Sequence, residues 1–220
     1  FHVDPMINKL PQNIYNAQLK ELYAIHQSGR KPRLLLHACC GPCASSVLVQ
    51  LYDYFDITIF YTNSNIYPAS EYTRRLAELK AFLPRFNQDY HANVKLIEDV
   101  YDPQAALKIL APHAHDKEGD QRCHLCYEMR IRKAMAYASA HHFEYCTTVL
   151  TLSRLKNSRV INEIALKVSQ DYPEVHYFFS DFKKNKGIDL SIDLTNLYDM
   201  YRQDYCGCVY SYHKNSESTK

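Results

Sequence analysis

A repeated alternation of short apolar runs with longer amphipathic segments constrains the fold of this chain most strongly. The apolar runs predict strands at residues 33–38, 57–63, 93–100, 144–151 and 175–182. The segments between them predict helices at 44–55, 70–86, 103–110, 122–142 and 153–172, with starts at Ser70 and Ser153 for the second and the last. Such alternation favours an α/β domain built on one parallel sheet, with helices on both faces.

Length and composition favour a single domain. The chain has 220 residues, of which 46% are hydrophobic, which is enough for one sizeable core. We expect an N-terminal helical extension at 1–32, an α/β domain that carries the site at 33–213, and a disordered tail at 214–220. No apolar run approaches the roughly 18 residues of a membrane span, and the first residues lack the apolar core of a secretory signal. We therefore expect a cytoplasmic protein with no membrane partner.

The cysteines carry most of the functional information. Seven of the eight cysteines fall into three groups, which are Cys39, Cys40 and Cys43, then Cys123 and Cys126, then Cys206 and Cys208. Without a secretory signal, such groups are more typical of metal or redox sites than of structural disulfides. The eighth, Cys146, stands alone in an apolar strand, and we interpret it as a buried residue outside the site.

The number of clustered thiols limits the kind of site. Residues 40–43 read CGPC, the letters of a thioredoxin dithiol, but a plain disulfide exchanger needs two thiols and not seven. A zinc ion or an iron–sulfur cluster takes about four ligands, so seven thiols suit one closed cluster plus a second metal with an open position. The first group directly follows the first predicted strand, where parallel sheets bind ligands. Neighbouring cysteines there can point toward different centres.

Five separated segments, in order, resemble one known family. They are HACCGPC, NSNIYPASEYTRR, RCHLCYEMRI, TTVLTLSRLKN and YRQDYCGCVYS, and together they span roughly residues 33–213. They resemble the QueH family of epoxyqueuosine reductases. The resemblance implies a HUP-like (adenine nucleotide alpha hydrolase-like) fold and an oxidoreductase that converts epoxyqueuosine to queuosine at the wobble position of tRNA. It also implies a [4Fe-4S] cluster beside a second metal ion, and an external electron donor.

The family chemistry suggests how the seven thiols divide. We assign the cluster to Cys40, Cys123, Cys126 and Cys208. We assign the second metal, iron or zinc, to Cys39, Cys43 and Cys206. Some relatives carry Asp at the position of Cys43, so the second metal here has an all-sulfur protein shell under this assignment. Gly41 and Pro42 then turn the chain and do not tune a dithiol.

Further candidates follow the predicted strands. Asn63, Asn65 and Tyr67 come after the second strand, where amides can read a base edge or ribose and Tyr67 or Tyr72 can stack on a flipped base. Arg154, Lys156 and Asn157 open a predicted helix after a strand, a position suited to phosphate.

Two basic runs and four polar residues next to cysteines are further candidates. The basic run at 130–133 is interpreted as solvated helix surface, and the run at 183–186 as another basic group. The possible proton donors are the polar residues next to cysteines, each of which we favour as a packing residue. They are His37, His124, Asp204 and Tyr205.

Three other functions are open to this sequence. An ATP-dependent tRNA-thiolating enzyme of related fold needs a Ser-Gly-Gly-x-Asp-Ser phosphate loop, where this chain has ACCGPCASS. A zinc-stabilised binding module would use four cysteines and leave three idle, and a thioredoxin-like exchanger would need no metal. The thiolating enzyme sometimes carries a cluster too, so its missing phosphate loop is what argues against it, whereas iron content separates the other two from an iron–sulfur enzyme.

Overall fold

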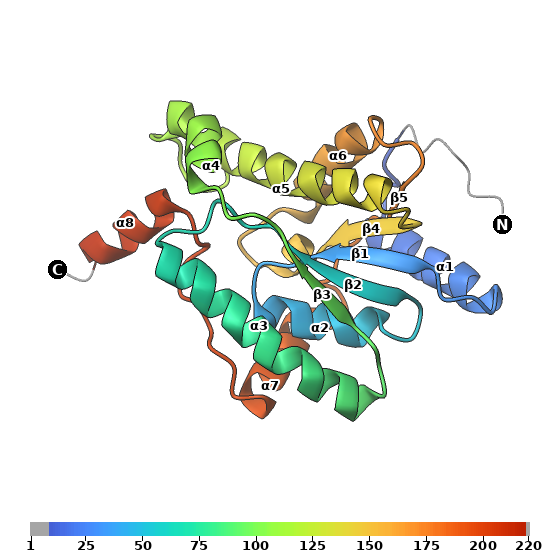
Figure 1. Ribbon diagram of the computed structural model, residues 1–220. Coiled ribbons are helices and arrows are strands. Elements are labelled where there is room, and N and C mark those ends of the chain that lie inside the picture. The colour runs from blue at the N-terminus through green and yellow to red at the C-terminus, as the bar shows by residue number, and fades with distance from the viewer. Residues whose placement is uncertain (1–8, 219–220) are drawn as a thin grey trace.

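The sheet has the predicted parallel architecture. In the computed structural model, which describes residues 9–218, five strands form one parallel sheet in the order β3-β2-β1-β4-β5 (Figure 1). Their bounds are β1 Arg33–His37, β2 Asp56–Tyr61, β3 Lys95–Glu98, β4 Tyr145–Thr148 and β5 His176–Tyr177. All five predicted strands are confirmed, although the last is two residues long where 175–182 is expected. The α/β class with a single parallel sheet is therefore confirmed.

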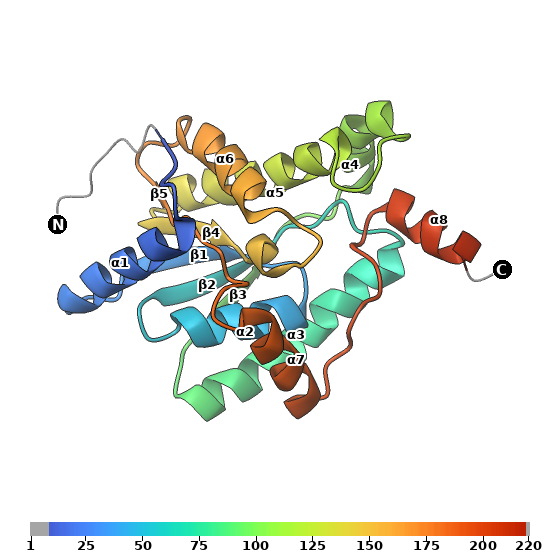
Figure 2. The same ribbon diagram turned by 180° about the vertical axis from the view of Figure 1, so that it is seen from behind.

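Helices cover both faces of the sheet. They are α1 Ile14–Gln27, α2 Gly41–Leu51, α3 Ala69–Tyr90, α4 Pro103–Leu110, α5 Gln121–Ala140, α6 Ser158–Ser169, α7 Gly187–Leu197 and α8 Val209–Ser218, with 3₁₀ turns η1 Ala111–His113 and η2 Val149–Leu152. Helices α2, α3 and α7 lie on one face and α5 and α6 on the other (Figures 1 and 2). Along β1, the side chains of Leu34 and Leu36 pack in the core under α2, α3 and α7, and that of Leu35 packs in the core under α5 and α6. A strand buried on both sides reads as a continuous apolar run, which is what 33–38 shows.

Three helix boundaries differ from the predictions for local reasons. Helix α3 is capped by Pro68 and not started by Ser70, and α2 begins at Gly41 because Pro42 fits the first helical turn. Ser153 does not cap α6. Residues 149–152 instead form η2, and Asn157 caps α6 by accepting the Val160 N–H at 3.2 Å.

The two ends of the described chain are helical. Helix α1 lies along the β5 edge, where a carboxylate oxygen of Glu21 lies 2.6 Å from His176 Nε2 and Gln18 accepts the Asp181 N–H at 2.8 Å. Residues 1–8 of the predicted extension lie outside the described residues. Helix α8 runs through Ser218 and so differs from the disordered tail predicted from residue 214. Within the described part of the chain, no helix has the length and apolarity of a membrane span.

The strand order fixes where a ligand can bind. Strand β1 pairs with β2 on one side and with β4 on the other, so the chain reverses its direction of travel across the sheet between β1 and β4. At such a switch point the loops leaving the two strands separate and open a crevice at the carboxyl edge. Here those loops are residues 38–40 and the segment that begins with η2.

Candidate metal centre and substrate cavity

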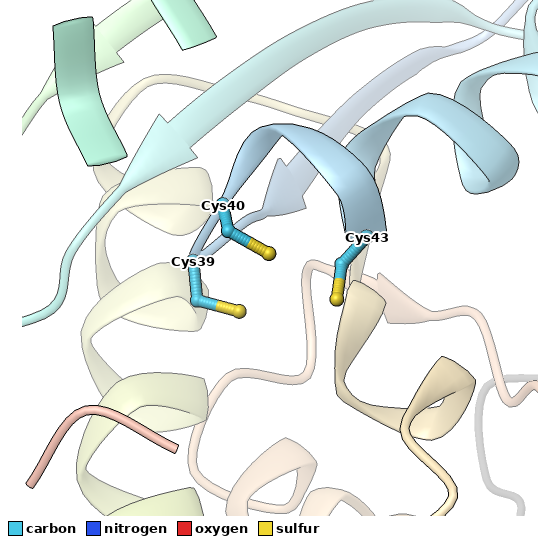
Figure 3. A group of neighbouring side chains, drawn as sticks. All are labelled: Cys39, Cys40 and Cys43. Carbon is cyan, nitrogen blue, oxygen red and sulfur yellow. The ribbon is translucent and has the colours of Figure 1, made fainter. Parts of the chain in front are cut away.

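Three thiols meet at the end of β1. Cys39 and Cys40 follow the strand, and Cys43 lies in the first turn of α2. Their sulfur atoms all lie within 4.8 Å of one another, and Figure 3 shows the three side chains facing a common space. This spacing allows shared or neighbouring metal ions without a change of backbone.

The other four clustered thiols gather beside this group. Cys123 and Cys126 lie in the first two turns of α5, and together with Cys206 and Cys208 they line one small cavity. The sulfurs of Cys206 and Cys208 are 3.7 Å apart. Gly207 between them has φ of 120°, a conformation open to glycine and rarely to other residues, so the turn that brings these two thiols together depends on it.

A larger cavity of about 310 Å³ opens next to the thiols. Cys39, Cys43 and Cys206 line it, and Cys206 borders the small cavity as well. Cys40, Cys126 and Cys208 are buried and do not line the large cavity. The thiol centre therefore has an enclosed part and a part that faces an open space.

Close contact between thiols changes their acidity. Hydrogen bonds from Cys40 and Cys43 lower the pKa of Cys39 well below its ordinary value. The hydrogen bond from Cys208, aided by the charge of Lys156, lowers the pKa of Cys206. The thiolate is the form that binds metals, and a lowered pKa favours it. Cys39 at the large cavity and Cys206 at both cavities are therefore suited to bind a metal.

Two buried arginines bring positive charge to the thiols. The Arg75 guanidinium donates to the carbonyls of Cys206 and Tyr205 at 3.2 and 3.1 Å and pairs with Glu71 at 2.9 Å. Arg130 donates to the Cys126 carbonyl at 3.4 Å. Such cations offset the negative charge of clustered thiolates.

The burial of Arg130 corrects the interpretation of residues 130–133 as solvated surface. Arg130 is only 4% exposed, because it lies one turn after Cys126 on the same face of α5. Arg132 and Lys133 do lie at the surface, where they bond Asp171 at 2.7 Å and Asp99 at 3.2 Å. Arg75 is 1% exposed and was not singled out from the sequence.

We expect Arg75→Met to lower the free energy of unfolding by about 3 kcal/mol, because it leaves the buried Glu71 without its ion-pair partner and two partly buried carbonyls without donors. The control is Arg74→Met, whose exposed guanidinium stacks over Tyr201 at 3.4 Å and should contribute about 1 kcal/mol or less. Urea unfolding monitored by circular dichroism measures both. Equal losses for the two variants would contradict the role given to Arg75.

His37 and Asn63 form a hydrogen bond to each other inside the fold. The Asn63 amide donates to the Ala38 carbonyl at 2.9 Å, so its oxygen faces His37 Nε2 at 3.1 Å. His37 Nδ1 then accepts from the Thr148 hydroxyl at 2.8 Å. Burial, with the charge of Arg130, lowers the pKa of His37 to about 4. His37 is therefore neutral and donates its one N–H to Asn63, and Asn63 is 1% exposed, so it is not free to read a base.

The other residues predicted after β2 lie in different surroundings. Asn65 is 6% exposed beside Cys206 and Cys208, and its side-chain oxygen has no hydrogen-bond partner within residues 9–218. Tyr67 is 39% exposed and packs edge-on against Tyr212 at 5.4 Å. Tyr72 is buried and stacked on Tyr101 at 4.0 Å, so it is closed to a base.

The large cavity collects several of the remaining candidates. Arg154, Lys156, Asp204 and Tyr205 line it, whereas Asn157 is used as the cap of α6 and His124 does not line it. Gln203 lines it too, and its buried side-chain oxygen has no partner in the described part of the chain. Sequence reasoning missed Gln203, although it stands in the segment YRQDYCGC that was used for the resemblance.

Cys146 lies apart from the other thiols. It is 1% exposed in β4 and packs into the core under α5 and α6. We expect Cys146→Ala to keep the full metal content and activity, at a cost of about 1 kcal/mol in the free energy of unfolding for one small buried group. Metal analysis and denaturant unfolding test this. Loss of metal from a folded variant would place Cys146 in the centre.

Fold and site together define an α/β protein with a thiol-rich centre, suited to a metal, at the switch point of a parallel sheet. The family model described as epoxyqueuosine reductase QueH matches residues 34–214, and the chain belongs to this family. The resemblance stated from the sequence is confirmed.

Curated relatives carry the same name. The chain is 40% identical over 215 residues to "Epoxyqueuosine reductase QueH" of Staphylococcus aureus, covering 96% of this chain and 89% of that protein. It is 41% identical over 187 residues to the Staphylococcus epidermidis protein of that name, covering 84% and 78%. The Streptococcus pyogenes protein of that name is 38% identical over 181 residues, covering 82% and 71%.

Proposed function

We propose that this protein is an epoxyqueuosine reductase, which removes the epoxide oxygen of epoxyqueuosine in tRNA and so forms queuosine. One structural observation carries the proposal beyond family membership. Six of the seven clustered thiols line two adjoining cavities, one small and one large, and the seventh, Cys40, has its sulfur within 4.8 Å of those of Cys39 and Cys43. A cavity of about 310 Å³ beside the thiols has the size of a site for one modified base.

We propose that the seven thiols hold a [4Fe-4S] cluster and a second metal ion, iron or zinc. For the cluster we propose Cys40, Cys123, Cys126 and Cys208, of which all but Cys123 are buried. For the second metal we propose Cys39, Cys43 and Cys206, which are the three thiols that line the open cavity. A closed set of four and an open set of three is the division expected for an electron-carrying centre and a catalytic metal. The nearby Arg75 and Arg130 suit the negative charge of such a centre.

Removal of an epoxide oxygen takes two electrons and two protons, and yields an alkene and water. When bound, the cluster supplies electrons one at a time and the second metal supplies Lewis acidity toward the epoxide oxygen. The apolar wall of Val149, Leu150 and Leu152 limits water at the reacting group. An external one-electron donor completes the reaction.

Protons must reach the same cavity. Tyr205 donates its hydroxyl to the Tyr67 carbonyl, and burial raises its pKa, so it stays protonated. Asp204 lines the cavity beside it. We propose that protons enter the cavity past these two side chains. We also propose that Arg154 and Lys156, which line the cavity, hold phosphates of the tRNA.

The proposal is tested with tRNA that contains epoxyqueuosine, incubated anaerobically with the protein and a strong one-electron reductant. Nucleoside mass spectrometry should show loss of epoxyqueuosine and gain of queuosine, and no change without the reductant. A protein with its full metal content that converts no epoxyqueuosine would contradict the proposal. Adding ATP and a sulfur donor tests the thiolating alternative, which requires a thionucleoside product.

A further inference from the structure

The loop at residues 153–157 separates two hollows on the surface. One is the thiol-lined cavity described above. The other is an open groove of about 560 Å³, lined by Arg159, Asp181 and Lys183 among others. Arg154, Leu155 and Lys156 line both hollows, so these three residues form a ridge between them.

The ridge presents an apolar side chain to solvent at its centre. Leu155 is 73% exposed, although it borders the thiol-lined cavity. Single exposed leucines are common on protein surfaces and carry no function by themselves. Leu155, however, borders the proposed reaction cavity and lies between two cations. This position indicates that its exposure serves the binding of a ligand.

Hydrogen bonds hold the ridge in this shape. Lys183 Nζ donates to the carbonyls of Thr151 at 2.7 Å and Lys156 at 3.0 Å, and so ties both ends of the loop together. Within the loop, the Leu155 N–H donates to the Ser153 hydroxyl at 3.3 Å and the Lys156 N–H to the Ser153 carbonyl at 3.2 Å. Leu155 is thus presented by an ordered loop, and little conformational entropy remains to be lost when a ligand contacts it.

The charges beside Leu155 suit a polyanion. The side chains of Arg154 and Lys156 make no hydrogen bond or ion pair with other residues in the described range 9–218. Arg159 in the groove pairs with Glu163 at 3.5 Å, and Lys183 is occupied by the loop carbonyls. The acid in the groove, Asp181, accepts from the Ser158 hydroxyl at 3.0 Å. Two cations whose side chains form no hydrogen bond or ion pair within residues 9–218 therefore flank the exposed leucine, and the charge of Lys156 also acts on Cys206.

We propose that Leu155 is a wedge that enters the RNA stack and fills the gap left when the target nucleotide turns into the thiol-lined cavity. This inference rests on the proposed function. A base that reacts inside the thiol-lined cavity must leave its stack, at a cost of roughly a few kcal/mol, and apolar side chains inserted at the gap offset part of that cost. Arg154 and Lys156 hold the phosphates on either side, and the groove beyond the ridge receives the adjoining backbone.

The wedge is tested with an anticodon stem–loop that contains epoxyqueuosine and carries 2-aminopurine next to it. Stacking quenches the fluorescence of 2-aminopurine, so the wild-type protein should raise it several-fold on binding. Leu155→Ala should bind within about threefold of wild type, because the phosphate contacts remain, but should give less than about half of the fluorescence rise. Leu155→Phe should restore the rise, because a ring can fill the same gap.

Leu197→Ala is the matched control, since Leu197 is 69% exposed at the far end of α7 and does not line either hollow. It should behave as wild type. The wedge is wrong if Leu155→Ala gives the full fluorescence rise at saturating protein, or if wild type converts epoxyqueuosine without any rise. The second result leaves the proposed function intact, whereas a wild-type protein that neither binds the stem–loop nor converts it contradicts both.

Discussion

Cys123→Ala is expected to abolish most of the iron content, the visible colour and the reductase activity together. Cys123 lies in the first turn of α5, where the Gly119 N–H donates to its sulfur at 3.2 Å and Cys126 follows on the same face. A methyl group cannot replace a thiolate ligand, and a four-ligand cluster with one ligand missing is poorly retained. Iron should fall from roughly four to five atoms per chain to less than about one.

Iron and acid-labile sulfide assays on anaerobically purified protein measure this loss, with absorption between 300 and 500 nm as a second reading, roughly the range of iron–sulfur charge transfer. Cys126→Ala should behave in the same way, and Cys146→Ala is the matched cysteine control. Circular dichroism confirms that each variant is folded. Full iron and colour in Cys123→Ala would show that this thiol is not a cluster ligand.

Cys43→Ala is expected to separate the two metals. Cys43 lines the open cavity and is assigned only to the second metal, so the variant should keep most of its iron, sulfide and colour. Conversion of epoxyqueuosine should fall at least about 100-fold, because Lewis acidity at the leaving oxygen contributes several kcal/mol to such reactions. Single-turnover conversion in tRNA, with metal content measured on the same sample, tests both halves of the prediction.

Cys43→Asp is the conservative companion of this variant. A carboxylate can replace a thiolate as a metal ligand, so part of the activity should return while the cluster content stays the same. If Cys43→Ala loses the cluster as completely as Cys123→Ala, Cys43 is a cluster ligand and the division into four and three thiols is wrong. Normal turnover by Cys43→Ala would show that the second metal plays no part in the reaction.

The sheet and the set of clustered thiols could be predicted from the sequence, because both follow from short stretches of neighbouring residues. Each strand is a short apolar run bounded by turn residues, and strand–helix alternation permits few topologies. The position of Cys39 after the first strand, and the two-residue gap between Cys123 and Cys126, pointed to a site at the carboxyl edge. The structure places these segments side by side there.

Features that depend on tertiary packing were not predictable. Arg130 reads as part of a basic surface run, and only the packing of α5 against the thiols shows that it is buried. From the sequence, Asn63 resembles a ligand-binding amide. In the fold its side chain is already hydrogen-bonded to His37 and to the Ala38 carbonyl. Helix α7 was not predicted at all, because its buried face includes the polar side chains of Ser191 and Thr195, which weaken the apolar periodicity.

We propose that the seven clustered thiols hold an iron–sulfur cluster and a second metal. Metal and acid-labile sulfide analysis of the anaerobically purified wild-type protein decides between this centre and a zinc-only site. We predict roughly four sulfides and four to five iron atoms per chain, with zinc making up the second metal where iron stops at four. Iron near zero together with stoichiometric zinc and no sulfide would contradict the claim, and would leave a zinc-stabilised protein in its place.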